Sequence, residues 1–357
     1  MTVVAITGAS SVLGPRLLRR VASASDITRI IAIDRSPPLG VTVTGCSFHE
    51  ADPGTADLRA VLAGVDVVVH LGATLEPTRD DALVRRREVD AAKRVAEAAA
   101  EAGVGHLVVT SSVLAYGAHP DNEVPLTEDR PIRGLSGLPA AEHAAEVEHW
   151  LERFRAAHPE VTVTTLRLAL LAGPDVDTLL TRALEAPRIP AVRGHRPPLQ
   201  FLHPDDAVDA IVHAIAHRLA GAYNVCADGW LSFDEVTAIL GRPALEVPEE
   251  VAYSGAAGVY ALRLGDLSPG LVSLFVHPCV MSNDALTATG WRPRASNRDA
   301  VAALAVEHGR YLTLGRVRAT RATVAVSALV GTALGSVALW QLARLARRRW
   351  QRRRARR

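Results

Sequence analysis

The chain has 357 residues, of which 48% are hydrophobic and 22% charged, which excludes a disordered chain. Its three cysteines (Cys46, Cys226 and Cys279) lie far apart, which excludes a disulfide framework and a paired-cysteine zinc motif. The net charge is +2, but nine arginines fall in residues 344–357 and the rest of the chain is acidic. Such a terminal block is typical of a tail for an anionic partner, and it does not favour nucleic acid, which usually meets a basic folded face.

Short β-branched runs alternate with helix-compatible stretches over the first 170 residues. The runs typical of buried strands are residues 3–7, 30–33, 67–71, 107–110 and 161–168. The stretches predicted as helices are residues 15–24, 57–63, 80–102 and 141–158. This alternation predicts an α/β fold with a Rossmann-type doubly wound parallel sheet, covered by helices on both faces.

The following part of the chain is less regular and contains many prolines. We expect helices at about residues 205–219 and 233–240, a short strand at 223–225 and a closing helix at 298–311. These elements predict a smaller region that is interleaved with the first one.

A glycine-containing loop follows the first predicted strand, in the sequence TGASSVLG. Gly8 and Gly14 occupy the outer positions of a Gly-x-x-Gly-x-x-Gly pattern, and Ser11 takes the middle position. The N–H groups of such a loop, together with the start of the next helix, hold a pyrophosphate. Gly8, Ser11, Val12, Leu13 and Gly14 are therefore candidate cofactor-binding residues.

The second predicted strand ends at Asp34, about 20 residues past the loop. A carboxylate at this place accepts hydrogen bonds from the adenosine ribose and repels a 2′-phosphate. Asp34 thus favours NAD as the cofactor over NADP, although Arg35 beside it leaves NADP open.

Further motifs resemble the extended short-chain dehydrogenases/reductases, in particular the NAD-dependent epimerase/dehydratase family that contains UDP-galactose 4-epimerase. They are Asp52, the stretch His70-Leu71-Gly72-Ala73, the stretch Thr110-Ser111-Ser112-Val113-Leu114-Ala115-Tyr116-Gly117, and Phe201-Leu202-His203-Pro204-Asp205-Asp206. The resemblance implies that Asp52 meets the adenine, that Leu71, Gly72, Ala73 and Thr110 line the cofactor, and that Ser112 is the catalytic serine. It divides the chain into an NAD-binding region (1–172), a substrate-side region (173–315) and a C-terminal segment (316–357).

The tyrosine and lysine that carry proton transfer in this family are missing. Aligned on Glu146, the sequence places Leu138 and Glu142 at their positions, and a shift by two places Ala140 and Ala144 there. The only lysine of the chain, Lys93, lies elsewhere.

Two asparagines of the family are also replaced, one by Glu88 and one by Leu170. His143 is a candidate substitute proton donor, although a solvated helix face is the favoured interpretation for it. Tyr116 is expected to be a packing residue.

Asp209, His213 and His217 share one predicted helix face, where a solvated face is favoured over a metal site. No metal is therefore expected.

Two functional hypotheses follow, because the sequence keeps the cofactor-binding motifs of the family and lacks its catalytic tyrosine and lysine. The first is a membrane-associated NAD-binding pseudoenzyme that acts as a sensor or scaffold. The second is an active epimerase, dehydratase or reductase that acts on a nucleotide-sugar or lipid-linked substrate with a non-family proton donor.

The C-terminal segment carries the membrane prediction. Residues 322–343 have no charge, and as a helix they would span about 33 Å, enough to cross a bilayer core of about 30 Å. We expect this helix and the arginine tail to bind anionic lipid on the cytoplasmic side of the membrane, either spanning it or lying in its plane. No signal peptide is expected at the start, and the family resemblance suggests a homodimer.

Overall fold

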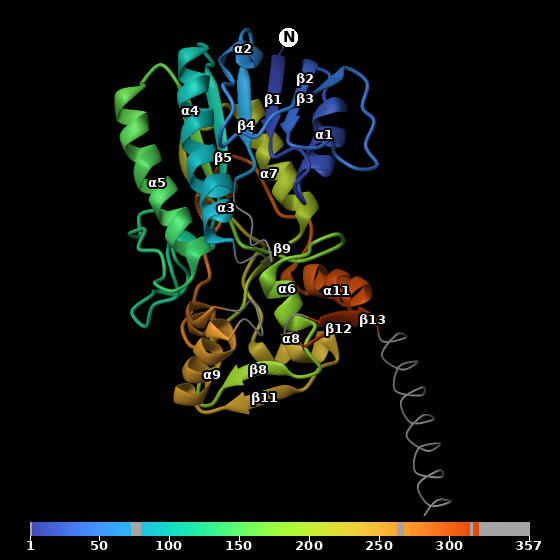
Figure 1. Cartoon of the computed structure of the whole chain (residues 1–357), viewed down its shortest axis with the longest axis vertical. Helices are drawn as coiled ribbons and strands as arrows, with labels where there is room; N and C mark the ends of the chain where they lie inside the picture. Colours follow the sequence, from blue (N-terminus) through green and yellow to red (C-terminus); the bar gives the residue numbers. More distant parts are fainter. Residues whose placement is uncertain (1, 73–79, 263–267, 315–316, 321–357) are drawn as a thin grey trace, which may run out of the picture.

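The computed structural model describes residues 2–72, 80–262, 268–314 and 317–320, and its centre is a seven-stranded parallel sheet (Figure 1). The strand order is β10-β6-β5-β4-β1-β2-β3. The strands are β1 (Thr2–Thr7), β2 (Ile27–Asp34), β3 (Cys46–Glu50), β4 (Val67–His70), β5 (His106–Ser112), β6 (Thr162–Leu168) and β10 (Gly221–Val225). The predicted α/β fold with a Rossmann-type parallel sheet is confirmed.

Helices cover both faces of this sheet. They are α1 (Gly14–Ala22), α2 (Arg59–Leu62), α3 (Asp81–Arg85), α4 (Ala91–Glu101), α5 (Pro139–Ala157) and α7 (Pro204–His217). Successive side chains of a strand point to opposite faces, so two apolar cores form. Val4 and Ile6 of β1 share one core with α1 and α7, whereas Ala5 shares the other with α4 and α5.

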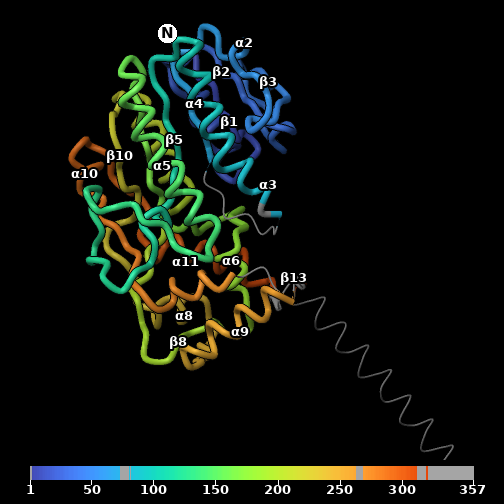
Figure 2. Tube along the Cα trace, turned by 60° about the vertical axis from the view of Figure 1, so that its left-hand side comes forward, coloured from blue at the N-terminus to red at the C-terminus, as the bar shows by residue number. Residues whose placement is uncertain are grey.

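The remaining elements, except α10 beside β10, form a smaller group below the carboxyl ends of the strands in the view of Figure 2. All of these remaining elements are β7 (Leu170–Leu171), α6 (Leu179–Leu184), β8 (Ile189–Val192), β9 (Phe201–Leu202), α8 (Phe233–Leu240), β11 (Ala244–Val247), α9 (Glu249–Ala261), α10 (Asp284–Ala288), α11 (Asn297–His308), β12 (Tyr311–Leu314) and β13 (Val317–Thr320). Because β10 belongs to the large sheet, this group is interleaved with it. The domain boundaries 172/173 and 315/316 stay predictions.

The structure adds one strand to the predicted elements of the large sheet and corrects two predicted helices. Strand β3 was not predicted, because most of its side chains are exposed and it has no buried apolar run. The predicted helix at 80–102 is divided into α3, a π-helical turn (η1, Arg86–Asp90) and α4. The closing helix ends at His308 and not at 311, because Tyr311 begins the hairpin of β12 and β13.

The apolar helix predicted at 322–343 lies outside the described residues. Within the ranges that the structure describes, no helix combines the length and the hydrophobicity that a membrane crossing requires.

Two buried histidines make the stability of this fold sensitive to acid. His70 and His106 are almost completely buried, and burial lowers the pKa of each imidazole from 6.5 to about 4. Between these values the unfolded chain binds more protons than the folded chain, so the free energy of unfolding falls as the pH drops through this window. Each histidine contributes at most about 3 kcal/mol to the loss.

We expect the urea concentration at the unfolding midpoint to decrease as the pH is lowered from about 7 to about 4.5. His106→Asn should reduce this fall, whereas His49→Asn should not, because His49 is exposed on β3. An unchanged fall in His106→Asn would contradict the assignment.

Candidate active site

The glycine loop between β1 and α1 is packed too tightly for larger residues at its ends. Gly8 has φ +76°, and a Cβ there would lie 2.7 Å from the carbonyl oxygen of Leu71. A Cβ on Gly14 would lie 2.1 Å from the carbonyl oxygen of Ala9. The Ser11 hydroxyl is buried and has no hydrogen-bond partner among the described residues. The loop therefore fits a pyrophosphate, and Ser11 Oγ is available to donate to one of its oxygens.

Asp34 is fixed beside this loop at the end of β2. Its carboxylate accepts hydrogen bonds from the backbone N–H groups of Ser10 (2.8 Å) and Arg35 (2.7 Å). The acid thus stands near the loop that would carry the pyrophosphate, as its predicted contact with the adenosine ribose requires. Arg35 is exposed.

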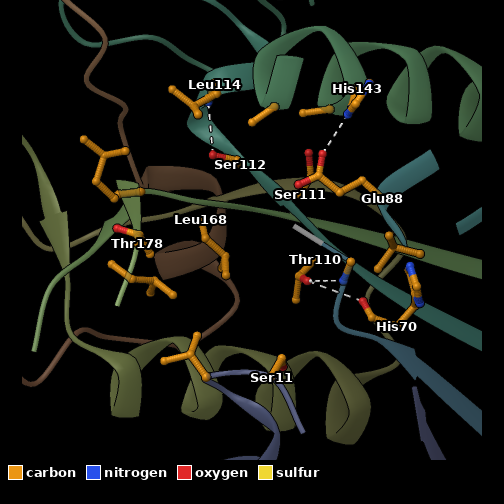
Figure 3. A pocket seen from close by; sticks show the side chains of 18 of the residues that line it. Ser11, His70, Glu88, Thr110, Ser111, Ser112, Leu114, His143, Leu168 and Thr178 are labelled. Atoms are coloured by element: carbon orange, nitrogen blue, oxygen red, sulfur yellow. Dashed lines mark hydrogen bonds and ion pairs between the residues drawn. The ribbon is translucent and has the colours of Figure 1, made fainter. Parts of the chain in front are cut away.

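A cavity of about 650 Å³ opens at the carboxyl ends of β1, β4, β5 and β6. Ser11 and Val12 line it on one side, and Ser112 lies on the opposite side with Glu88 and His143 (Figure 3). This edge of a doubly wound sheet is where ligands of such folds bind. The cavity is therefore the candidate active site.

The other predicted cofactor residues lie around the loop, and some of them line the cavity. Gly72 and Thr110 line it, and the Gly72 N–H donates to Thr110 Oγ1 (3.2 Å). Leu13 and Leu71 are buried beside the loop, where they pack in the core. Asp52 follows β3, and its carboxylate accepts from the Gly54 N–H (2.9 Å).

Ala73 lies outside the described residues. The structure therefore says nothing about the predicted contact of Ala73 with the cofactor.

Ser112 is presented to the cavity at the end of β5. Its hydroxyl oxygen accepts the N–H of Leu114 (3.2 Å), so its own hydrogen is available to a substrate. Tyr116, four residues later, is 1% exposed and bonds Asn224 and Arg167, and burial raises its pKa to about 12. The prediction that Tyr116 is a packing residue is confirmed.

The structure corrects the expectation that His143 lies on a solvated helix face. His143 is buried, and its Nδ1 lies 2.8 Å from Oε2 of Glu88, which is also buried. Both side chains line the cavity (Figure 3). The interpretation as a solvated helix face is wrong, because α5 packs this side chain against η1.

The two alignments for the missing tyrosine and lysine place different residues at the cavity. Ala140 and Ala144 line it, whereas Leu138 is buried in the core and Glu142 is exposed, with its carboxylate accepting the Gly137 N–H. The structure therefore favours the shift by two.

The glutamate that fits this alignment is Glu148. It is buried and pairs with Arg167 at 2.7 Å. Glu146, the residue used as the anchor, instead pairs with Arg85 and Lys93 at the partly exposed side of α5.

On the predicted helix face with Asp209, His213 and His217, side chains are engaged in contacts with other residues of the protein. Asp209 pairs with Arg20 (2.9 Å), and His213 Nε2 lies 2.8 Å from the Thr289 hydroxyl. Among the described residues, no group of three or more potential ligands is arranged to hold a metal ion.

The fold and the loop define a dinucleotide-binding α/β protein of the short-chain dehydrogenase/reductase type. The chain belongs to the NAD dependent epimerase/dehydratase family, whose model matches residues 4–226. This assignment agrees with the expected NAD cofactor.

Relatives and solved structures extend over most of the chain. An uncharacterised protein of Mycobacterium tuberculosis (strain ATCC 25618 / H37Rv) is 32% identical over 254 residues, which are 69% of this chain and 68% of that protein. The 3-diazoavenalumate denitrifying reductase of Streptomyces sp. is 31% identical over 260 residues, 66% of this chain and 80% of the enzyme.

Two solved structures share the fold at lower identity. MoeE5 in complex with UDP-glucuronic acid and NAD has a TM-score of 0.66 and 22% identity, covering 86% of this chain and 98% of its own. The UDP-glucose 4-epimerase of Thermus thermophilus in complex with NAD has a TM-score of 0.65 and 18% identity, covering 86% and 99%.

The pairing of Glu88 with His143 was not predicted from the sequence. The two residues are 55 positions apart, and each stands on a different helix. The sequence offered one signal for this pairing. Glu88 and the segment that holds His143 both depart from the family pattern in the catalytic part of the site, where a change at one position favours a change at a neighbouring position.

Proposed function

We propose that the protein is an NAD(H)-dependent oxidoreductase in which Glu88 and His143 take over the proton transfer of the missing tyrosine and lysine. The observation that carries this proposal is the buried Glu88–His143 pair on the cavity wall. Buried titratable pairs in a cleft are typical of catalytic sites. The Streptomyces relative is named as a reductase, which supports the same class of reaction.

The side chains of the cavity have separate roles in this proposal. Bound NAD(H) supplies or accepts a hydride. Ser112 donates a hydrogen bond to the polar atom of the substrate. Glu88 Oε2 and His143 Nδ1 hold a proton between them that compensates the charge left by hydride transfer. Gly8, Ser11 and Gly14 hold the pyrophosphate, and Asp34 holds the ribose.

The competing function is the inert NAD-binding sensor or scaffold that the lost tyrosine and lysine suggested. The two differ in one measurement, the loss of NADH absorbance in the presence of an acceptor. We expect the full chain with NADH to reduce 4-(dimethylamino)cinnamaldehyde, an aromatic aldehyde. NADH binding without any reduction of this aldehyde would favour the sensor.

The cofactor preference is a further expected result. The full chain should bind NADH more tightly than NADPH, because the Asp34 carboxylate repels a 2′-phosphate. Asp34→Ala should reduce this preference by about tenfold, as measured by titration of NADH and NADPH fluorescence. Asp26→Ala is the matched control, since Asp26 is exposed before β2. An unchanged preference in Asp34→Ala would contradict the role of Asp34.

Membrane association is proposed from the sequence of the C-terminal segment. The uncharged residues 322–343 and the nine arginines after them favour anionic lipid, by about 1 kcal/mol for each arginine near the surface. We expect the full chain to float with vesicles that contain phosphatidylserine and a chain truncated after residue 320 to stay behind. Equal flotation of both chains would contradict the proposal, and proteolysis from outside intact cells tests the cytoplasmic side.

A further inference from the structure

One part of the cavity lining is apolar. We name it the leucine wall, and it consists of Leu114, Leu168, Leu170, Leu171 and Leu180. Leu114 lies in the short turn after β5, Leu168 ends β6, Leu170 and Leu171 form β7, and Leu180 lies in α6. The family resemblance implies that Leu170 replaces an asparagine that contacts the substrate. The wall therefore offers a substrate apolar contact in place of hydrogen bonds.

The charges around the cavity are arranged against a second phosphate group. Among the described lining residues, the only arginines are Arg16 and Arg19, and both belong to α1 beside the glycine loop. Arg16 is already paired with Asp175 (2.9 Å) and Asp205 (3.2 Å). The charged residues that the smaller group of elements contributes to the described lining are Asp175 and Asp177, and Asp177 is in turn paired with Arg182 (2.7 Å).

Among the described residues, a diphosphate beside the leucine wall would therefore meet arginines whose charge is already compensated by carboxylates. Burial of an anion that gains no new ion-pair partner is costly. The binding of an apolar molecule would instead become more favourable with each apolar surface that it buries. Both effects favour an apolar ligand over a diphosphate beside the leucine wall.

We propose that the substrate is an apolar organic molecule without a phosphate group, which binds against the leucine wall, and not a nucleoside diphosphate sugar. This proposal rests on the proposed function, since it places the substrate in the same cavity. It goes beyond that function by naming the class of molecule that the cavity admits.

The test measures binding to the full chain saturated with oxidised NAD, which cannot reduce an aldehyde. The probes are 4-(dimethylamino)cinnamaldehyde, followed by its absorption shift, and UDP-glucose, followed by calorimetry. We expect the aldehyde to bind and UDP-glucose to show no binding up to about 1 mM. Leu170→Asn and Leu171→Asn should each weaken aldehyde binding by about tenfold. Leu245→Asn, a matched change of an exposed leucine on β11, should not.

Two outcomes overturn the proposal. One is binding of UDP-glucose but not of the aldehyde, and the other is aldehyde binding that neither Leu170→Asn nor Leu171→Asn weakens. Because the readout is binding, it is independent of turnover. A chain that binds the aldehyde against the leucine wall and never reduces it with NADH keeps this inference and loses the proposed function.

Discussion

Glu88→Gln and His143→Gln are each expected to slow aldehyde reduction by about 10²–10⁴-fold, the usual contribution of general acid–base catalysis. Hydride transfer to an aldehyde leaves an alkoxide, and the proton held between Glu88 and His143 neutralises it in the proposed reaction. Either substitution removes one of the two groups that hold this proton. The measurement is the single-turnover decay of NADH absorbance with excess 4-(dimethylamino)cinnamaldehyde.

Matched controls separate this effect from changes in stability or charge. Glu152→Gln and His149→Gln alter exposed residues of the same helix, α5, and should leave the rate unchanged. A second acceptor, N-methyl-3,4-dihydroisoquinolinium, gives a neutral amine after hydride transfer and needs no proton. Its reduction by His143→Gln should stay within about threefold of that by the parent chain.

The comparison of the two acceptors separates proton transfer from a structural role. Equal slowing of both acceptors in His143→Gln would show that Glu88 and His143 only support the structure of the cavity wall.

Arg167→Leu is expected to lower the free energy of unfolding by about 3–5 kcal/mol, because it leaves a buried carboxylate without its ion-pair partner. Arg167 lies near the end of β6 and is 5% exposed. It bonds Glu148 (2.7 Å), the Tyr116 hydroxyl (2.6 Å) and the carbonyl oxygen of Glu128 (3.1 Å). In the variant, Glu148 would keep its hydrogen bond from Ser111 but lose its ion-pair partner. Urea denaturation measures the difference.

A double variant tests the cause of this loss. Arg167→Leu combined with Glu148→Leu should recover part of the stability, because the unpaired charge is removed as well. Arg153→Leu, an exposed change on α5, should cost no more than about 0.5 kcal/mol. A double variant less stable than Arg167→Leu alone would show that packing, and not the isolated carboxylate, causes the loss.

The central sheet could be predicted because buried parallel strands are continuous apolar runs in the sequence. Residues 67–71 and 107–110 are such runs, and both lie in the middle of the sheet as β4 and β5. Strand β3 is a sheet edge, and four of its five side chains are exposed, so its sequence has no such run. The strands β8, β11, β12 and β13 are four residues long and pair outside the large sheet, and contacts between distant segments determine them.

The cofactor half of the site could be predicted for a related reason. Gly8, Gly14 and Asp34 act through local backbone geometry, which a short motif specifies. The proton-transfer half could not be predicted, because Glu88 and His143 meet only through the packing of η1 against α5. The sequence of α5 allows two alignments that differ by two residues, and only the cavity lining distinguishes Ala140 and Ala144 from Leu138 and Glu142.

The place of β10 in the sheet has a consequence for synthesis on the ribosome. Strand β6 pairs with β5 on one side and with β10 on the other, and β10 comes more than fifty residues later. At about 5–20 residues per second, the nascent chain exposes one edge of β6 for roughly 3–10 s. An unpaired edge is a template for pairing with another chain. The nascent chain is therefore exposed to aggregation and to chaperones between the emergence of Leu168 and that of Val225.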